Sequence, residues 1–199
     1  MTAQKMSTLR YEDQDWSVCE ISGNPDSIPS STQLGFETEM KSTANHSGRI
    51  DHYLVQDGKL LLWKIEVNLT NEHRAFVPDN GGRETLISEY WCQTLGGASE
   101  LYKSAEVCLV YNELRIPLTG RIVLGRDFNQ DLYVHMGTQT ANRFNQRLIL
   151  SFSGGSLDAG NIVRETGVTV DGLAADPSVQ DKVERENAAK RAHWRSTLK

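Results

Sequence analysis

The sequence contains few cysteines: Cys19, Cys92 and Cys108 are the only three in 199 residues. An odd number without a C-x-x-C spacing argues against a disulfide framework and against a cysteine zinc site. A reducing compartment fits this cysteine usage better than an oxidising one. Residues 1–10 contain no apolar stretch of the kind that forms a secretory signal. We therefore expect a cytoplasmic protein.

Long apolar runs and a surplus of basic residues are missing as well. No segment approaches the roughly 20 apolar residues of a membrane-spanning helix. The formal net charge is −5, which does not favour nonspecific nucleic-acid binding. The sequence has no Gly-rich phosphate loop and no G-x-S-x-G motif, and its five histidines show no metal-ligand spacing. We expect no cofactor, no metal and no membrane contact, with nucleic acid as a disfavoured partner.

Short apolar runs at regular intervals are the main structural signal. Residues 49–69, RIDHYLVQDGKLLLWKIEVNL, form two such runs joined at Asp57-Gly58, which predicts a β-hairpin. Alternation in the second run predicts that one face carries Leu61, Trp63, Ile65, Val67 and Leu69. Further strands are predicted within residues 105–111, 114–125, 132–137 and 146–152. The pattern favours a mainly β protein, an antiparallel sandwich or a barrel-like roll.

Two helices are predicted beside these strands. In residues 83–95, RETLISEYWCQTL, apolar side chains recur at spacings of three and four, and Gly96-Gly97 would end the helix. Asp176-Pro177 is a typical helix start for the C-terminal segment. Residues 1–48 are polar and rich in turn formers, although Trp16, Val18 and Ile21 could form a short strand near the start. The predicted organisation is an irregular extension (1–48), a β-rich core domain (49–172) and a C-terminal helix (173–199).

Four segments occur in a recognisable order: YLVQDGKLLLWKIE, ELRIPLTGRIVLG, LYVHMG and RLILSF. Together they resemble a group of small uncharacterised bacterial β-rich proteins, which share a D-G hairpin, an L-R-I-P-x-x-G segment and a Y-V-H-M-G segment. The resemblance covers about residues 49–157. It implies a β-rich core, and because the group has no established activity it assigns no catalytic residue.

A metal-dependent nuclease is the enzymatic alternative. Such enzymes place an aspartate on one strand of a hairpin and Glu-x-Lys on the next, so that the carboxylates hold Mg²⁺. Asp51 and Glu66 lie at the matching ends of the predicted hairpin, and Glu39 could add a carboxylate. Asn68, however, stands where the pattern requires lysine. Mg²⁺ is therefore expected only under this alternative.

A binding surface is predicted in the second half of the chain. Strand alternation puts Tyr133 and His135 on one face of their predicted strand. Arginines recur through the second half of the chain, and because arginine is a frequent interface anchor, a protein partner is at least as plausible as a nucleic acid. The sequence thus favours a non-catalytic cytoplasmic bacterial protein-binding module, such as an immunity-type or defence-system accessory protein, by fold-level analogy. A structural homo-oligomer subunit is a further alternative. The predicted binding residues are Arg115, Arg121, Tyr133, His135, Arg143 and Arg147.

Overall fold

The computed structural model describes residues 4–41, 44–85, 90–93, 99–102, 105–133 and 138–166. The chain divides into two compact units, residues 1–166 and residues 167–199. The second unit lies outside the described residues, and so do the predicted C-terminal helix and His135. Within the described ranges, no helix is both long and apolar enough to cross a membrane.

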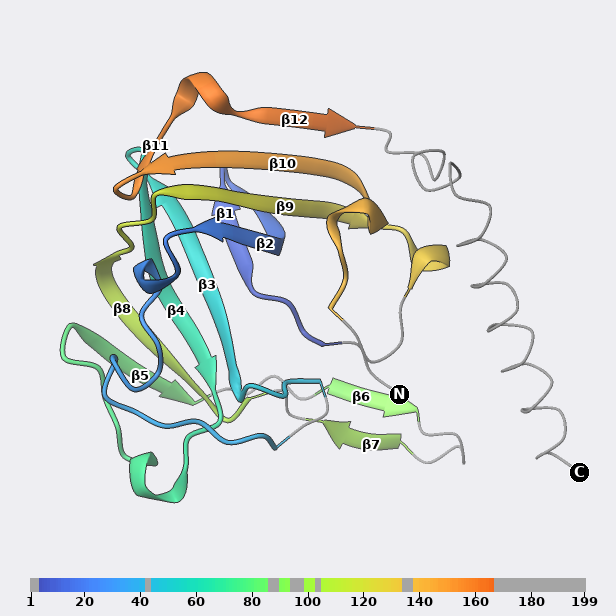
Figure 1. The fold of residues 1–199 in the computed structure, drawn as a ribbon. Helices are drawn as coiled ribbons and strands as arrows, with labels where there is room; N and C mark the ends of the chain where they lie inside the picture. Colours follow the sequence, from blue (N-terminus) through green and yellow to red (C-terminus); the bar gives the residue numbers. More distant parts are fainter. Residues whose placement is uncertain are drawn as a thin grey trace, which may run out of the picture. The chain divides into compact units, whose positions relative to one another are not determined.

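The first unit is mainly β, as the sequence predicts, and most of its strands form one sheet of ten (Figure 1). The strands of this sheet are β1 (Thr8–Tyr11), β2 (Gln14–Gly23), β3 (Arg49–Gln56), β4 (Lys59–Val67), β5 (Gly81–Thr85), β8 (Val107–Arg115), β9 (Gly120–Phe128), β10 (Phe144–Ser153), β11 (Ser156–Leu157) and β12 (Val163–Thr166). A separate two-stranded sheet pairs β6 (Tyr90–Gln93) with β7 (Ser99–Tyr102). Single 3-10 turns occur at Pro25–Ser27, Asn71–His73, Gln130–Leu132, Ala141–Arg143 and Ala159–Asn161.

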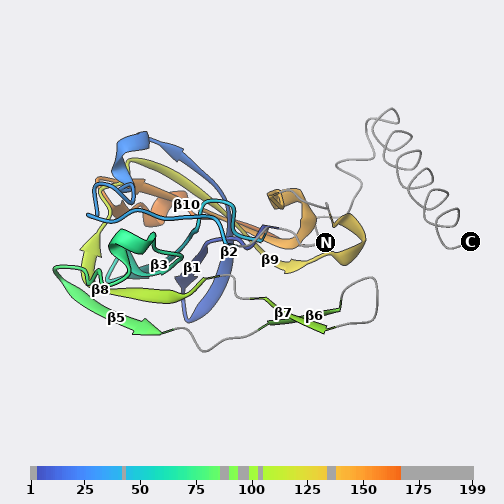
Figure 2. The same cartoon turned by 90° about the horizontal axis from the view of Figure 1, so that it is seen from below.

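The large sheet is bent so strongly that the strand at one end of its order also pairs with a strand much further along it. The strand order is β11-β10-β9-β2-β1-β3-β4-β8-β5, and β11 pairs with β4 as well as with β10. The sheet is mixed, because β1 runs parallel to β3 while its other neighbour, β2, is antiparallel. Figure 2 shows the curvature from below. The inner face of the bent sheet surrounds the core, whose fully buried members include Leu9, Tyr53, Leu62, Ile65, Leu109, Ile122 and Leu124.

The predicted hairpin at Asp57-Gly58 is confirmed. β3 and β4 pair antiparallel from Arg49↔Val67 to Gln56↔Lys59. Asp57 and Gly58 both adopt positive φ, 51° and 67°. Positive φ at two successive turn residues is what a tight two-residue hairpin requires, and Asp-Gly tolerates it best. Local turn chemistry was sufficient to place this hairpin.

The N-terminal residues belong to the sheet. The short strand predicted around Trp16, Val18 and Ile21 lies within β2 and is confirmed, whereas the prediction of an irregular segment before it is wrong, because Thr8–Tyr11 forms β1. The two strands form the β1–β2 hairpin, which lies between β9 and β3. Its turn residues Glu12 and Asp13 take positive φ, and its two strands bury Leu9 and Trp16 in the core. The polar composition concealed β1, because only one face of this strand is apolar.

The predicted internal helix is wrong. Arg83 and Thr85 belong to β5 and pair with Leu109 and Val107 of β8, and Tyr90–Gln93 forms β6. A short window can match helical spacing by chance, and here backbone pairing with a distant strand overrides that local pattern. The prediction of a strand at residues 132–137 is wrong for its first residue, because Leu132 is the last residue of a 3-10 turn. Residues 134–137 lie outside the described residues.

Candidate functional site

Trp63 occupies a β-bulge in the middle of β4. Residue His52 of β3 pairs with Lys64 and the next residue, Tyr53, pairs with Leu62, so Trp63 is the extra residue. The pairing of β4 with β8 shifts at the same place. A bulge moves the alternation by one residue and redirects a side chain. The prediction that Leu61, Trp63 and Ile65 share one face is therefore wrong.

The bulge carries Trp63 out of the core. Leu62 and Ile65, on either side of the bulge, are both fully buried in the core, whereas Trp63 is half-buried on the outer face of the sheet. Around it lie Arg10, His52 and Lys64, and we call these four residues the Trp63 patch. The patch spans the three neighbouring strands β1, β3 and β4.

Two cations flank the indole of Trp63. The Cζ atom of Arg10 lies 6.0 Å from the ring centroid and the Nζ atom of Lys64 lies 5.2 Å from it. The imidazole of His52 stands edge-on to the same ring, with centroids 6.4 Å apart. A cation near a tryptophan ring is attracted by the electron-rich face of that ring. The indole is therefore held in a defined position at the protein surface.

Arg10 is oriented by Asp15 of β2. The guanidinium donates from Nε to Oδ1 at 2.8 Å and from Nη2 to Oδ2 at 3.0 Å. This bidentate hydrogen bonding lowers the pKa of Asp15. Both side chains are about half exposed, at 47% and 59%, so the pair contributes little to stability. Its main effect is to fix the direction of Arg10 beside Trp63.

A chain of polar contacts supports His52 from behind. Thr8 Oγ1 lies 2.8 Å from His52 Nδ1, and His52 Nε2 lies 3.1 Å from Glu66 Oε1. Lys5 Nζ donates to the other carboxylate oxygen of Glu66 at 2.6 Å. When Nε2 carries the proton it donates to Glu66, and Nδ1 then accepts from the Thr8 hydroxyl. His52 and Glu66 are each only 7% exposed, so the imidazole is fixed beneath the indole.

The charges around Glu66 favour a permanently ionised carboxylate. Burial alone would raise the pKa of Glu66, but hydrogen bonds from His52 and Lys5 outweigh burial and lower it to about 2. Cys108, the register partner of Glu66 on β8, is buried, and burial raises its pKa to about 11. A thiol with so high a pKa stays protonated near neutral pH and is a poor nucleophile.

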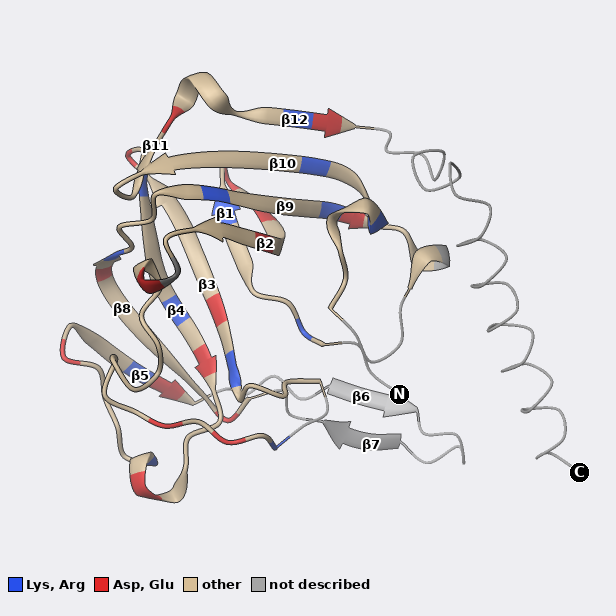
Figure 3. Ribbon diagram, in the orientation of Figure 1, with Lys and Arg blue, Asp and Glu red and all other residues tan. Residues whose placement is uncertain are grey.

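The carboxylates predicted for a Mg²⁺ site do not converge. On β4, Glu66 pairs with Ile50 and its neighbour Ile65 pairs with Asp51. Adjacent residues of a strand point to opposite faces, so Asp51 and Glu66 lie on opposite faces of the sheet. Glu39 forms an ion pair with Lys41 at 2.9 Å. Figure 3 marks the charged residues on these strands. The described residues contain no group of three or more His, Cys, Asp or Glu placed to hold a metal ion.

The predicted arginine surface is only partly assembled. Arg121 of β9 and Arg147 of β10 share the outer face, since they pair with Ser151 and Gly125 respectively. Arg147 is occupied by an ion pair with Glu165. Arg115 lies at the end of β8, which is not adjacent to β9 in the sheet. These arginines therefore do not form one continuous face.

Arg143 has a local structural role. Its Nη1 donates to the carbonyl oxygen of Leu132 at 2.9 Å and to Gln139 Oε1 at 3.1 Å. Burial lowers the pKa of this guanidinium. Arg143 thus ties together the two described ends of the segment between β9 and β10. Tyr133, by contrast, is 41% exposed and stays within the predicted binding set.

Sequence reasoning missed most of the Trp63 patch. Arg10 and Thr8 lie in the segment interpreted as irregular, and their partners on β3 and β4 are more than 40 residues away along the chain. One signal was present: Leu60, Leu61 and Leu62 precede Trp63 without a polar residue. An uninterrupted apolar run cannot satisfy strict alternation, and this indicates a register irregularity.

The geometry supplies an oriented indole, two flanking cations and a fixed imidazole on the outer face of the sheet. These groups can bind a partner through stacking, cation and hydrogen-bond contacts. The resemblance of residues 49–157 to small bacterial β-rich proteins remains a prediction and assigns no role to these groups. No family model matches the chain, and comparison with curated proteins and with solved structures finds no similar protein.

Proposed function

We propose that the protein is a non-catalytic binding module that contacts a protein partner through the Trp63 patch. One observation carries the proposal: a bulge displaces Trp63 from the core and presents it between Arg10 and Lys64. Tryptophan and arginine dominate the binding free energy of protein interfaces. A half-buried indole that is already held in place loses little conformational entropy when a partner packs on it.

The two cations beside the indole favour a partner segment that carries carboxylates. The whole chain carries a formal net charge of −5. Near the patch, the bases Lys5, Arg10 and Lys64 lie among the acids Asp13, Asp15, Glu66 and Glu84, but the two charges beside the indole itself, Arg10 and Lys64, are both positive. Complementary charges accelerate association and select among partners. We therefore expect a protein segment with an apolar or aromatic residue for the indole and carboxylates for the two cations.

The support behind the patch is consistent with preorganised binding. Hydroxyl, imidazole and carboxylate follow one another in Thr8, His52 and Glu66, as they do in serine hydrolases. Here Glu66 is also ion-paired with Lys5, and His52 faces the indole. We infer that the contacts with Thr8 and Glu66 hold His52 against Trp63, and that His52 does not activate the Thr8 hydroxyl as a nucleophile. Purified protein is then expected to show no ester hydrolysis above that of a Thr8→Val variant.

The decisive experiment compares variants of two apolar residues, the half-buried Trp63 and the exposed Met40, in partner capture. Wild type, Trp63→Ala and Met40→Ala are used as baits, and recovered proteins are identified by mass spectrometry. Met40 is a matched control, because it is a large apolar side chain that is 60% exposed outside the patch. We expect one protein to be recovered by wild type and Met40→Ala and lost with Trp63→Ala. With that protein purified, Trp63→Ala should raise Kd about 30-fold or more.

Equal recovery by Trp63→Ala and wild type would refute the patch as the contact surface. Loss of the partner after nuclease treatment would point to nucleic acid, because aromatic and basic groups also bind single strands. Mg²⁺- or Mn²⁺-dependent cleavage of DNA or RNA that is lost in both Asp51→Ala and Glu66→Ala would replace the proposal with the nuclease alternative. Folding of each variant is checked by circular dichroism.

A further inference from the structure

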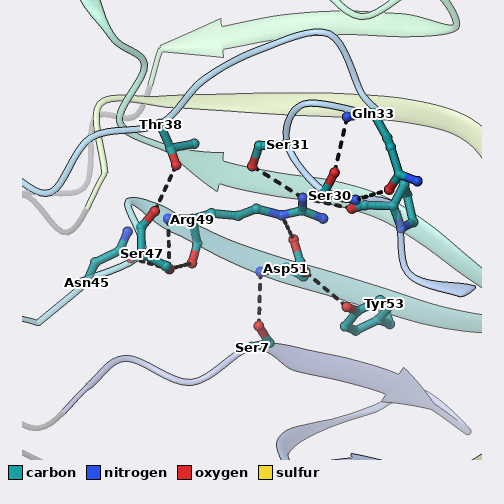
Figure 4. A network of polar contacts seen from close by, with 11 residues as sticks. Ser7, Ser30, Ser31, Gln33, Thr38, Asn45, Ser47, Arg49, Asp51 and Tyr53 are labelled. Carbon is teal, nitrogen blue, oxygen red and sulfur yellow. Dashed lines mark hydrogen bonds and ion pairs between the residues drawn. The ribbon is translucent and has the colours of Figure 1, made fainter. Parts of the chain in front are cut away.

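Several arginines of the sheet are neutralised by a neighbouring carboxylate. Arg49 shows this arrangement on the inner face, where its pairing with the core residue Val67 places it. Its Nε donates to Asp51 Oδ1 at 2.6 Å, and its Nη1 donates to the carbonyl oxygen of Pro29 at 2.9 Å (Figure 4). Ion pairs of the same kind join Arg10 to Asp15, Arg147 to Glu165 and Arg164 to Glu12.

Arg126 of β9 differs from these four arginines, because its hydrogen-bond partner is neutral. It follows the core residue Leu124 by two positions and therefore lies on the inner face. Its Nε and Nη2 both donate to Oε1 of Gln146, its register partner on β10, at 3.1 Å and 2.7 Å. Within the described ranges, no carboxylate forms an ion pair with this guanidinium. Arg126 thus keeps its full positive charge.

The acids nearest to Arg126 in the strand register have other partners. Asp15 and Glu165 belong to the ion pairs with Arg10 and Arg147. Asp127, the next residue of β9, accepts a hydrogen bond from Asn145 Nδ2 at 3.0 Å. None of these three carboxylates therefore serves as the counter-ion of Arg126.

The guanidinium of Arg126 is nevertheless held in a defined orientation. Its Cζ lies 4.9 Å from the ring centroid of Trp16, a core residue that is 5% exposed. The indole covers one face of the guanidinium, and Gln146 occupies the edge formed by Nε and Nη2. The edge formed by Nη1 and Nη2 is left, and solvent reaches it because Arg126 and Gln146 are both half-buried.

The free edge carries two parallel N–H groups, and this geometry matches the two oxygens of a carboxylate. The amide of Gln146 adds a further donor. Because its Oε1 accepts from Arg126, its Nε2 is left to donate. Donors that are already oriented lose little conformational entropy on binding.

We propose that the Nη1–Nη2 edge of Arg126 and Nε2 of Gln146 bind the carboxylate of a small organic acid. A singly charged group is favoured because the site offers one cation without a counter-ion and one neutral amide. The site is independent of the proposed protein contact, since Trp63 lies on the outer face of β4, which is not a neighbour of β9.

Binding is tested by NMR titration of the ¹⁵N-labelled full chain with sodium acetate at constant ionic strength. The Nε signal of Arg126 and the indole Nε1 signal of Trp16 report on the site, and Arg126→Lys and Trp16→Phe assign them. We expect acetate to shift both signals saturably. Acetamide, which has the same shape without the charge, and sodium chloride should not. Inorganic phosphate should bind more weakly than acetate.

Two variants test the two donors, with the Trp16 signal as the readout. Arg126→Lys keeps the charge but loses the paired N–H groups, so it should raise Kd for acetate about tenfold. Gln146→Glu supplies Arg126 with the counter-ion that the other arginines have, so it should abolish acetate binding without lowering the melting temperature. Arg121→Lys, the same change at an exposed arginine of β9, should leave Kd unchanged.

Three results would overturn the proposal. The first is the absence of a saturable shift with acetate, or an equal shift with chloride or acetamide. The second is an unchanged Kd in Arg126→Lys or in Gln146→Glu. The third is tighter binding of phosphate than of acetate, because the site would then select a different anion. Trp63→Ala should bind acetate as wild type does, so failure of the Trp63 patch and failure of this site give different results.

Discussion

The outer and inner faces of the β3–β4 hairpin hold their polar side chains in different ways. On the outer face, both ring nitrogens of His52 and both carboxylate oxygens of Glu66 have partners. The imidazole at the centre of these contacts stands edge-on to the half-buried indole of Trp63. On the inner face, Arg49 and Asp51 are tightly paired, yet Arg49 Nη2 and the Tyr111 hydroxyl are left over.

The two faces differ in whether their polar groups satisfy one another. Polar groups that satisfy one another rigidify a surface, and that surface then binds through what it displays, here Trp63. Polar groups that remain unsatisfied in a buried place carry a desolvation cost instead, so they lower the stability of the face that holds them. One hairpin can combine both arrangements, because its alternation assigns successive residues to opposite faces.

The largest expected effect on the free energy of unfolding distinguishes the core residue Trp16 from Trp63. Trp16 is 5% exposed and belongs to the core, whereas Trp63 is bulged onto the outer face. Trp16→Ala should lower the free energy of unfolding by about 3–5 kcal/mol, the usual cost of truncating a buried tryptophan. Trp63→Ala should cost well under half of that. Urea denaturation measures both, and equal losses would show that Trp63 is a core residue.

The ion pairs of the two faces provide the next comparison. Asp51→Ala leaves the buried guanidinium of Arg49 without its counter-ion, which should cost about 3–5 kcal/mol. Asp15→Ala breaks the exposed pair with Arg10 and should cost less than about 1 kcal/mol. Both are measured by urea denaturation at pH 7. A small effect of Asp51→Ala would mean that Arg49 finds another anion on the inner face.

Acid should weaken the outer-face chain specifically. The pKa of Glu66 is about 2 in the folded protein, against 4.5 as its ordinary value. A depressed folded-state pKa gives stability that is fully present above pH 4.5 and is lost as the pH falls towards 2. Wild type should lose about 2 kcal/mol more than Glu66→Gln between pH 6 and pH 3. Parallel pH profiles of the two proteins would contradict the low pKa.

The sequence predicted what local chemistry determines and missed what distant pairing determines. The Asp57-Gly58 hairpin needed only two residues that tolerate positive φ. The parallel pairing of Thr8 with His52 joins residues 44 positions apart, and no periodicity in either segment encodes it. The same holds for β5, whose pairing with β8 replaced the predicted helix.

The candidate site was hidden for a related reason. Trp63 was visible as an apolar residue at an alternating position, and strict alternation assigned it to the core. The bulge that reverses this assignment depends on register with both β3 and β8, which only the folded sheet fixes. Arg49 and Tyr111 were ordinary strand residues in the sequence, because an unsatisfied donor is defined by its surroundings.

The smallest expected effects compare one hydroxyl from each face. Thr8→Val removes the hydroxyl that contacts His52 Nδ1 at 2.8 Å and keeps the shape of the side chain, so it should lower the free energy of unfolding by about 1 kcal/mol. Tyr111→Phe removes a hydroxyl without a partner in the described structure, so it should cost about nothing. Urea denaturation of both variants resolves the difference. If Tyr111→Phe costs as much as Thr8→Val, the Tyr111 hydroxyl has an acceptor within the protein and both faces satisfy their own polar groups.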